Sequence, residues 1–514
     1  MDFEDIMILQ KRPMRYNKTI AIIVLCVLAI FLRSYGLDSH IGPDETLEVD
    51  RALDALKGTF YWSRIIKGGL YILLIPLYFI LNFFSHSYET FLIAGRLIQV
   101  ILGTCIIYFI YKILEMLYGS SWAVLFTLPP IINVHLIENA HHVNVQNLMF
   151  LFLIIHLYII IKYFKEKKDN RLLGLSLIPL FAGAACQISA FILIIPYGIL
   201  VAIYSKKINK ERKRDIGTHI LRWMAISIFI YILLTPGILI YLPRTLGFVT
   251  GLLGITDAVL SRADMASSYV AVSDLNFWTS YAERIINFYG KGYFILVSIS
   301  SIFIIWKKKW ILFYPLGIFL LYYLVFVNAA QTVFSVRYII PGLIMGFIVM
   351  PFAVVECSHR MNHYTKKIQY GTIGILVAVI LVFLLRSSFY TWDFVRQFGL
   401  PDTRTRLAEW LEEHTSENTI ILLEDSVVYP KIDTRPVELI EHWNAYQPLD
   451  SVKADYIVLN KSEYDILYKK RMKTRYQQFY LEVINSPLWT AVHHERRIGG
   501  KTTGHEFIVY HTNR

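Results

Sequence analysis

Twelve apolar segments, most of them separated by short basic loops, constrain the fold of this chain more than any other feature of its sequence. Hydrophobic residues make up 55% of the chain and its mean hydropathy is +0.47. Repeated apolar runs in such a composition are typical of a polytopic helical membrane protein. The segments cover residues 19–31, 70–84, 97–114, 122–137, 148–164, 172–185, 190–204, 219–241, 292–306, 311–327, 339–355 and 371–385.

The positions of the basic residues predict how these segments cross the membrane. The segment 70–84 follows Gly68-Gly69, contains Pro76, and is shorter than the roughly 18 to 20 residues that a span needs. If it stays at the outer surface, every strongly basic loop faces the cytoplasm, as the positive-inside rule requires: 165–171, 206–214, 307–309 and 360–367. We therefore predict about 11 transmembrane helices plus juxtamembrane helices, with the N-terminus in the cytoplasm.

The same threading predicts two domains. Residues 1–386 form an all-α transmembrane domain with large outer loops at 34–94 and 242–291, and residues 387–514 form an extracytoplasmic domain. In this tail the pattern of residues 403–414 predicts an amphipathic helix. Short apolar runs predict buried strands at 419–423, 456–459 and 507–510, so the tail is expected to be a small α/β domain.

Charge and cysteine usage exclude two other classes of function. The net charge of +12 comes from basic residues in short loops between apolar segments, where helix orientation explains them, so no nucleic acid partner is expected. The four cysteines lie in or beside apolar segments without C-x-x-C spacing, and they indicate neither a disulfide framework nor a zinc site.

The adjacent carboxylates Asp44 and Glu45 follow the first apolar segment by about a dozen residues. The threading places them just outside the membrane on the non-cytoplasmic side, and neither acid is needed for insertion. A carboxylate within hydrogen-bonding reach can take the proton of an attacking hydroxyl, so the pair indicates chemistry on a lipid-borne substrate. The structural alternative is that Asp44 caps a helix that begins after Pro43.

The stretch from Arg33 to Glu45, followed by Ala52 and Lys57-Gly58, resembles the first outer loop of GT-C class membrane glycosyltransferases, in particular the protein O-mannosyltransferase and lipid A aminoarabinose transferase branch. The resemblance implies a GT-C fold and transfer from a polyprenyl-phosphate-linked sugar, with Asp44 as the catalytic base and Glu45 as an orienting acid. Because lipid phosphate is already a good leaving group, such a site needs cations rather than a second catalytic acid. A single displacement of this kind inverts the configuration at the anomeric carbon of the sugar.

Three basic residues are the candidates for binding the donor phosphate. Lys67 stands where relatives carry a lysine or histidine before two prolines, although here Gly68 and Gly69 replace the prolines. Arg96 resembles the family's arginine at the outer end of the second span; the alternative is that it snorkels to lipid headgroups. Arg337-Tyr338 resembles the family's R-Y motif at the end of an outer loop, so Arg337 is predicted to clamp phosphate and Tyr338 to contact sugar or acceptor.

The short outer loop 138–147 is the other dense polar patch. We predict that His141, His142 and Gln146 contact acceptor or sugar. Gln146 stands where many relatives carry an aspartate, so no metal is expected on the acidic pair and no cofactor is firmly predicted. A divalent metal bound by Glu138, His141 and His142 is an alternative, but adjacent histidines on a helix point in different directions.

The sequence thus predicts an inverting glycosyltransferase in the cytoplasmic membrane whose active site is extracytoplasmic. Its partners would be a polyprenyl-phosphate-linked sugar donor, a lipid, glycan or protein acceptor, and membrane lipids. Alternatives are a transferase for a pentose on the same class of lipid, an acceptor-binding module, and a lipid or polysaccharide transporter (flippase) with an outer-face polar gate. A transporter typically shows internal repeats and ionisable residues near the midplane, and the sequence pattern indicates neither.

Overall fold

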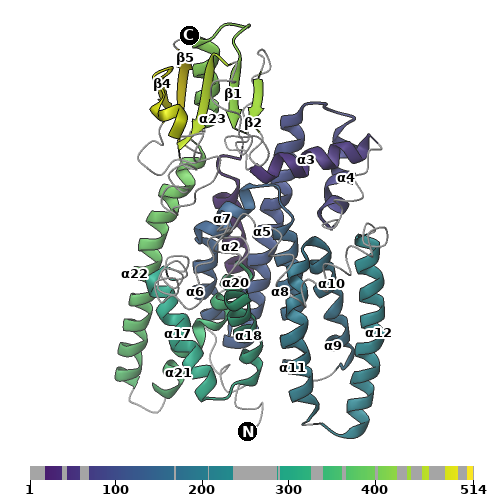
Figure 1. Cartoon of the computed structure of the whole chain (residues 1–514). Coiled ribbons are helices and arrows are strands. Elements are labelled where there is room, and N and C mark those ends of the chain that lie inside the picture. Colours follow the sequence, from purple (N-terminus) through teal and green to yellow (C-terminus); the bar gives the residue numbers. More distant parts are fainter. Residues whose placement is uncertain are drawn as a thin grey trace. The chain divides into compact units, whose positions relative to one another are not determined.

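The computed structural model describes residues 18–37, 43–57, 69–166, 169–206, 208–235, 286, 290–325, 340–361, 366–399, 403–424, 437–440, 454–461, 481–495 and 506–512. The chain divides into two compact units (Figure 1). Unit 1 comprises Met1–Ser34 and Val49–Thr391, and unit 2 comprises Tyr35–Glu48 and Trp392–Arg514. The segment that carries Asp44 and Glu45 therefore groups with the C-terminal residues.

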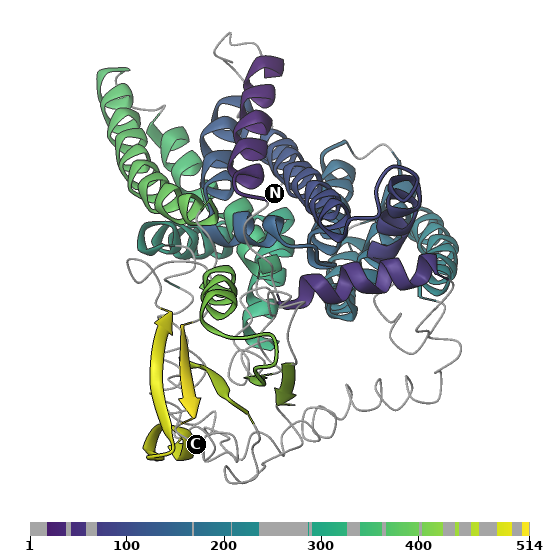
Figure 2. The same cartoon turned by 90° about the horizontal axis from the view of Figure 1, so that it is seen from above.

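Unit 1 is helical, and Figure 2 gives the view of its helices from above. Helices α3 (Pro43–Leu56) and α22 (Lys366–Phe398) belong partly to each unit. The other helices of unit 1 are α2 (Lys18–Ser34), α4 (Tyr71–Leu81), α5 (Tyr88–Tyr118), α6 (Ser120–Ile131), α7 (Val134–His141), α8 (Gln146–Glu166), α9 (Arg171–Leu175), α10 (Leu177–Cys186), η3 (Ile188–Leu193), α11 (Ile194–Ser205), α12 (Lys210–Leu234), α17 (Lys291–Trp306), α18 (Trp310–Val325), α20 (Ile340–Val349) and α21 (Pro351–Arg360).

Several of these helices are long and apolar enough to cross a membrane. Among the described residues there are five: α5, α8, α12, the stretch Ile340–Arg360 formed by α20 and α21, and Gly374–Phe398 within α22. The bent pair α6 and α7 makes a sixth if it is counted as one span. The chain is a multi-pass membrane protein, while helix length alone does not establish the predicted number of about eleven spans.

Two lysines connect three helix ends at one end of unit 1, one through an ion pair and one through a hydrogen bond. Lys18 Nζ at the start of α2 lies 3.4 Å from Glu115 Oε1 near the end of α5. Lys165 Nζ in the last turn of α8 donates to the carbonyl oxygen of Met116 at 2.8 Å. Helix α2 therefore runs antiparallel to α5 and α8, and the basic ends gather where the positive-inside rule would put the cytoplasm.

Helix α4 corresponds to the apolar segment 70–84. It has 11 residues, so it is about 16 Å long and covers roughly half of a hydrocarbon core. Leu74 and Tyr78 are buried, whereas Ile80 and Phe83 are exposed. Apolar helices of 10 to 17 residues also occur in segments predicted to span, so the position of α4 at the outer surface stays a prediction.

The segment 122–137, predicted as a single span, is broken. Pro129 and Pro130 lack the N–H groups that continue a helix, and α6 ends at Ile131. Helix α7 starts after Asn133, whose side chain accepts from Leu136 N at 3.2 Å, and the two axes differ by 61°. The predicted span 122–137 is therefore bent between α6 and α7, as in a broken span or a re-entrant loop.

Side chains from other helices satisfy the carbonyl groups freed at this break. The Arg33 guanidinium, 1% exposed, donates to the carbonyl oxygens of Pro130 and Ile131, each at 3.4 Å. The Thr391 hydroxyl donates to the carbonyl oxygen of Ile132. Irregular backbone at membrane depth is stabilised by such bonds, so these side chains support the change of direction between α6 and α7.

Unit 2 contains a five-stranded sheet of order β2-β1-β3-β5-β4. Its strands are β1 (Ile421–Glu424), β2 (Val437–Ile440), β3 (Tyr456–Asn460), β4 (Trp489–Glu495) and β5 (Phe507–Thr512). Strands β2, β1 and β3 are parallel, with Ile421 opposite Val437 and Tyr456, and β5 runs antiparallel to β3 and β4. The predicted helix is present as α23 (Thr403–His414), and the predicted strands as β1, β3 and β5.

The sheet alternates its apolar residues between two packed faces. On one face, Leu407 and Leu411 of α23 cover Val458 and Phe507. On the other face, Ile457 and Tyr510 pack with Val483 from the helical turn 481–485. Residues of β3 are buried on both faces of the sheet, and α23 covers one of these faces with its apolar side, so the unit is a layered α/β fold.

Candidate functional site

Asp44 and Glu45 lie in the first turn of α3, which begins at Pro43. A proline at the first helical position and acids in the first turn both favour a helix start, because proline has no N–H to leave unpaired and the carboxylates face the positive end of the helix dipole. The pair therefore has a local structural reason as well as a chemical one. The side chains of both residues lie outside the described part of the chain.

Glu48 is a further carboxylate of α3 that the sequence reading missed. It is only 6% exposed, and Val49 and Ala52 beside it are fully buried. On a helix, positions four apart share a face, whereas neighbours are separated by about 100°. Position 48 therefore lies one turn after Asp44 on the same side of α3, a spacing that could have identified it.

Arg96 lies in the third turn of α5 and is 1% exposed. Its guanidinium is enclosed by protein, so the snorkelling alternative does not describe it. The preceding Gly95 makes room for this packing: a Cβ there would lie 2.6 Å from Tyr78 Oη and 2.8 Å from Val143 Cγ2. Only glycine lets α4 and the loop before α8 approach α5 this closely beside the arginine.

Gly95, Gln99 and Gly103 form a stripe along α5 because they are spaced four residues apart. At Gly103 a Cβ would lie 3.1 Å from Arg33 Nε and 3.2 Å from the Cβ of Ala140. The two glycines thus allow α2, α4, α7 and the loop before α8 to approach α5 closely. Gln99 lies between the two glycines on this stripe. Small residues at such spacing let helices pack closely in membranes.

Asn147, in the first turn of α8, connects the three helices of this region. Its Nδ2 donates to Gln99 Oε1 of α5 at 3.0 Å and to the carbonyl oxygen of Asn139 in α7, also at 3.0 Å. Its Oδ1 accepts from Asn139 Nδ2. All three side chains are buried. We call Gln99, Asn139 and Asn147 the amide cluster.

Asn144 holds the loop between α7 and α8. Its Nδ2 donates to the carbonyl oxygens of Asn139 and His142, both at 2.9 Å. Its Oδ1 accepts from the backbone N–H of Gln146 at 2.9 Å, which caps the start of α8. A loop bonded at both ends by one side chain presents its neighbours in fixed positions.

The structure encloses two of the three predicted contact residues of this loop. His141 is 3% exposed, and its Nδ1 donates to the carbonyl oxygen of Ile137 at 2.9 Å. Gln146 is 5% exposed, and its Oε1 has no hydrogen-bond partner among the described residues. His142 is half-buried. The loop surrounds the amide cluster, so these three residues and Arg96 are brought to the same region of unit 1.

The residues considered for a metal site do not converge. Glu138 Oε2 lies 3.7 Å from His135 Nδ1, one turn earlier on α7. Within the described ranges, no three His, Cys, Asp or Glu side chains gather closely enough to bind a metal ion. Glu138, His141 and His142 therefore do not form the alternative three-ligand site.

Several predicted site residues lie outside the described part of the chain. They are Lys67, Arg337 and Tyr338, together with most of the outer loop 242–291. Their assignment to the donor and acceptor sites stays a prediction.

Sequence comparisons find no match: no family description fits the chain. No curated protein matches it either. Among solved structures, the chain is similar to the Archaeoglobus fulgidus oligosaccharyltransferase in complex with Zn and sulfate, with 10% identity, a TM-score of 0.49, and coverage of 88% of this chain and 69% of that one.

It is also similar to ArnT from Cupriavidus metallidurans. The structure bound to undecaprenyl phosphate gives 11% identity and a TM-score of 0.47, and the apo structure gives 10% and 0.48. Each comparison covers 96% of this chain and 97% of ArnT. Similarities of this size do not establish a shared activity, so the function proposed below depends on the residues of this chain.

Proposed function

We propose that this protein is an inverting GT-C type glycosyltransferase that transfers a sugar from a polyprenyl-phosphate-linked donor to an acceptor on the outer face of the cytoplasmic membrane. The observation that carries the proposal is the acidic pair Asp44-Glu45 at the start of α3, the first helix after the N-terminal apolar helix α2. An acidic pair in this position is the feature by which the sequence resembles GT-C enzymes.

In the proposed reaction Asp44 takes the proton of the acceptor hydroxyl as the oxygen attacks the anomeric carbon. The bond between that carbon and the phosphate oxygen breaks in the same step, and the lipid phosphate leaves with the electron pair. One displacement from the opposite face inverts the sugar. Glu45 orients the acceptor, and Glu48, one turn after Asp44 and buried, is a further acid on the same helix.

The leaving phosphate requires positive charge, for which we propose Lys67, Arg96 and Arg337. Arg96 is held in the third turn of α5, where Val143 of the loop before α8 approaches the neighbouring Gly95, so its proposed part in this set is as a fixed group beside that loop. A charge-assisted hydrogen bond to phosphate contributes about 1.5 to 3 kcal/mol. Loss of one such contact should weaken donor affinity by roughly 10- to 150-fold.

We also propose eleven spans, with α4 lying on the outer surface. The lysines that gather at the start of α2 and the ends of α5 and α8 support a cytoplasmic position for these ends. The opposite ends, which carry the loop 142–145 and Arg96, would then be extracytoplasmic. His141, His142 and Gln146 are proposed to contact sugar or acceptor there, together with Tyr338.

One observation concerns the transporter alternative: His156, an ionisable residue, is buried near the middle of α8. Its Nδ1 donates to the carbonyl oxygen of Ser176 at 2.6 Å, and its Nε2 bonds to the hydroxyl of Tyr314. Both ring nitrogens are therefore used to connect α8 with the α9–α10 junction and α18. This arrangement supports a structural role rather than a transport pathway.

A transfer assay tests the proposal. The full chain in nanodiscs, mixed with radiolabelled polyprenyl-phosphate sugar and a membrane extract as acceptor, should move the label to a new product. Arg96→Gln should raise the donor concentration needed by roughly tenfold or more. The matched control is Arg171→Gln, since Arg171 is an exposed arginine at the start of α9. The proposal fails if no polyprenyl-linked donor loses its sugar.

A further inference from the structure

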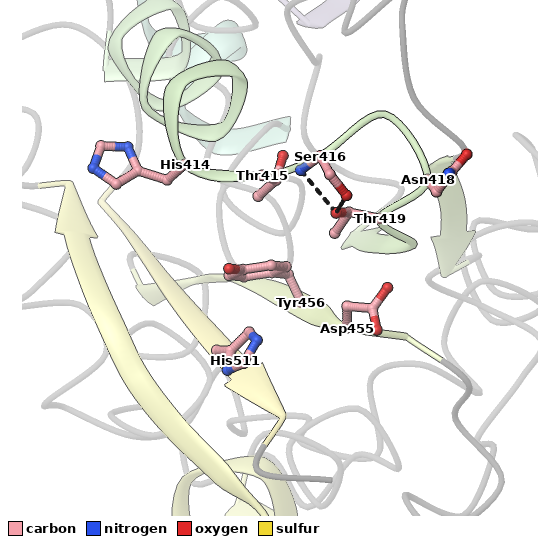
Figure 3. Close-up of a pocket in the computed structure, with 8 residues that line it drawn as sticks. All are labelled: His414, Thr415, Ser416, Asn418, Thr419, Asp455, Tyr456 and His511. Atoms are coloured by element: carbon pink, nitrogen blue, oxygen red, sulfur yellow. Dashed lines mark hydrogen bonds between the residues drawn. The ribbon is translucent and has the colours of Figure 1, made fainter.

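Unit 2 contains a pocket of about 360 Å³ at one end of its sheet (Figure 3). Helix α23 ends there, strands β1 and β3 begin there, and β5 ends there. Six of the side chains that line it are Ser416, Asn418, Thr419, Asp455, Tyr456 and His511. The volume is near the lower limit of ligand pockets in proteins, which suits a ligand of monosaccharide size.

Backbone hydrogen bonds fix the frame of the pocket. Asp455 and Ile420 bond twice, since Asp455 Oδ2 accepts from Ile420 N at 2.8 Å and Asp455 N donates to the carbonyl oxygen of Ile420 at 2.9 Å. Thr419 Oγ1 accepts from the backbone N–H of Ser416 at 3.0 Å. The loop that leads from α23 into β1 is thus held against the start of β3 without a ligand.

Polar groups remain available in this frame. Within the described residues, no hydrogen bond is formed by Asp455 Oδ1 or by the side-chain amide of Asn418. Figure 3 shows Asp455 below the hydroxyl pair Ser416–Thr419, with Asn418 at the outer edge of the pocket. A carboxylate oxygen, an amide and hydroxyls offer both donors and acceptors, which is the combination that adjacent hydroxyl groups of a sugar require.

Aromatic rings supply the other half of the site. The rings of Tyr456 and His511 have centroids 4.7 Å apart and are tilted by 55°. His414, which also lines the pocket, stacks on Trp410 at 4.5 Å, and the far face of Trp410 stacks on His493 at 4.4 Å. Packing therefore holds the ring walls in place, and the surface exposed to the pocket is mainly polar.

The charged side chains that line the pocket do not favour an anionic ligand. The residues that line the pocket include a carboxylate and no lysine or arginine. A phosphate or carboxylate ligand needs such cations for charge-assisted hydrogen bonds. We propose that this pocket is a binding site for a neutral saccharide unit, held by hydrogen bonds to Asp455 and Asn418 beside the rings of Tyr456 and His511. The proposal goes beyond the transfer reaction and does not depend on Asp44.

Saturation-transfer NMR on the full chain tests this assignment. The protein is reconstituted in nanodiscs, because sugar-headed detergents would occupy the pocket, and is mixed in turn with methyl glycosides of mannose, glucose, galactose and N-acetylglucosamine. Saturation should reach the ring protons of at least one glycoside. Asn418→Ala and Asp455→Asn should each lower that transfer roughly fivefold or more, the effect of one lost hydrogen bond.

The matched control is Glu506→Gln, which removes a carboxylate at the opposite end of β3 and β5, where Glu506 pairs with Lys461 at 3.6 Å. It should leave the transfer unchanged. Asn418 is exposed, so its replacement tests binding without affecting folding. The assignment is overturned if no glycoside receives saturation from the wild type, or if the variants transfer as well as the wild type. Broadening of an inorganic phosphate signal that Asn418→Ala abolishes would instead identify an anion site. Saturation transfer reports binding alone, so a protein without glycosyltransferase activity would still give this signal.

Discussion

Replacing Asn147 with leucine should loosen the region of unit 1 where α5, α7 and α8 meet. Leucine keeps the branching of asparagine at Cγ, but it removes three hydrogen bonds. Asn139 Nδ2 and Gln99 Oε1 are then buried without partners, which costs about 1 to 3 kcal/mol for each group. Interhelical hydrogen bonds in a membrane protein average about 0.6 kcal/mol, so three of them set a lower figure near 2 kcal/mol. We therefore expect a local loss of at least about 2 kcal/mol.

Hydrogen exchange measured by mass spectrometry would detect this loss directly. A decrease of about 2 kcal/mol in the local opening free energy speeds exchange by roughly 30-fold. The effect should appear in peptides covering residues 134–147 and not in peptides from unit 2. Adding Gln99→Leu to Asn147→Leu removes the unpaired acceptor, so the double variant should exchange less than the two single effects together imply.

Asn82→Ala is the matched control, because the bond between Asn82 Oδ1 and His86 Nδ1 at 3.1 Å is solvent-exposed and water can replace it. It should change exchange by less than about threefold. If Asn147→Leu also changes exchange in residues 134–147 by less than about threefold, the amide cluster does not hold these helices together.

Two further predictions concern glycines at close contacts. Gly95→Val should cost about 1 to 3 kcal/mol through overpacking against Tyr78 and Val143, measured as a lower thermal midpoint in nanodiscs, and an unchanged midpoint would mean that α4 does not pack there. Gly36→Ala should destabilise unit 2 by about 2 kcal/mol, because φ is +70° and a Cβ would lie 2.5 Å from the backbone of Phe398; unaltered proteolysis of the C-terminal residues would contradict this.

The sequence predicts best where one local signal decides the structure. Helix 403–414 was predicted because its apolar residues recur on one face, and the central strands because they are apolar and covered on both sides of the sheet. Strands β2 and β4 were missed because they form the two edges of the sheet. Edge strands carry more polar residues, as the sequence of β4 with His493 and His494 illustrates, and β4 also contains a bulge near Ala491.

The candidate site could be predicted only in part, because only some of its residues have a local signal in the sequence. Asp44 and Glu45 stand out in sequence because nothing in membrane insertion requires them. The amide cluster could not be predicted, since the pairing of Gln99 with Asn147 depends on how α5 and α8 are rotated against each other. Pro129-Pro130 indicate the break between α6 and α7, whereas the hydropathy of this segment alone does not.

The rate of transfer by Asp44→Asn tests the central claim most directly. A general base contributes about 100- to 10,000-fold, so kcat should fall by at least about 100-fold while the affinity for the polyprenyl-phosphate-linked donor stays within about threefold of wild type. The control Asp54→Asn, which changes a half-buried carboxylate later in α3, should keep full activity. Turnover by Asp44→Asn within about threefold of wild type would contradict the assignment of this carboxylate as the base.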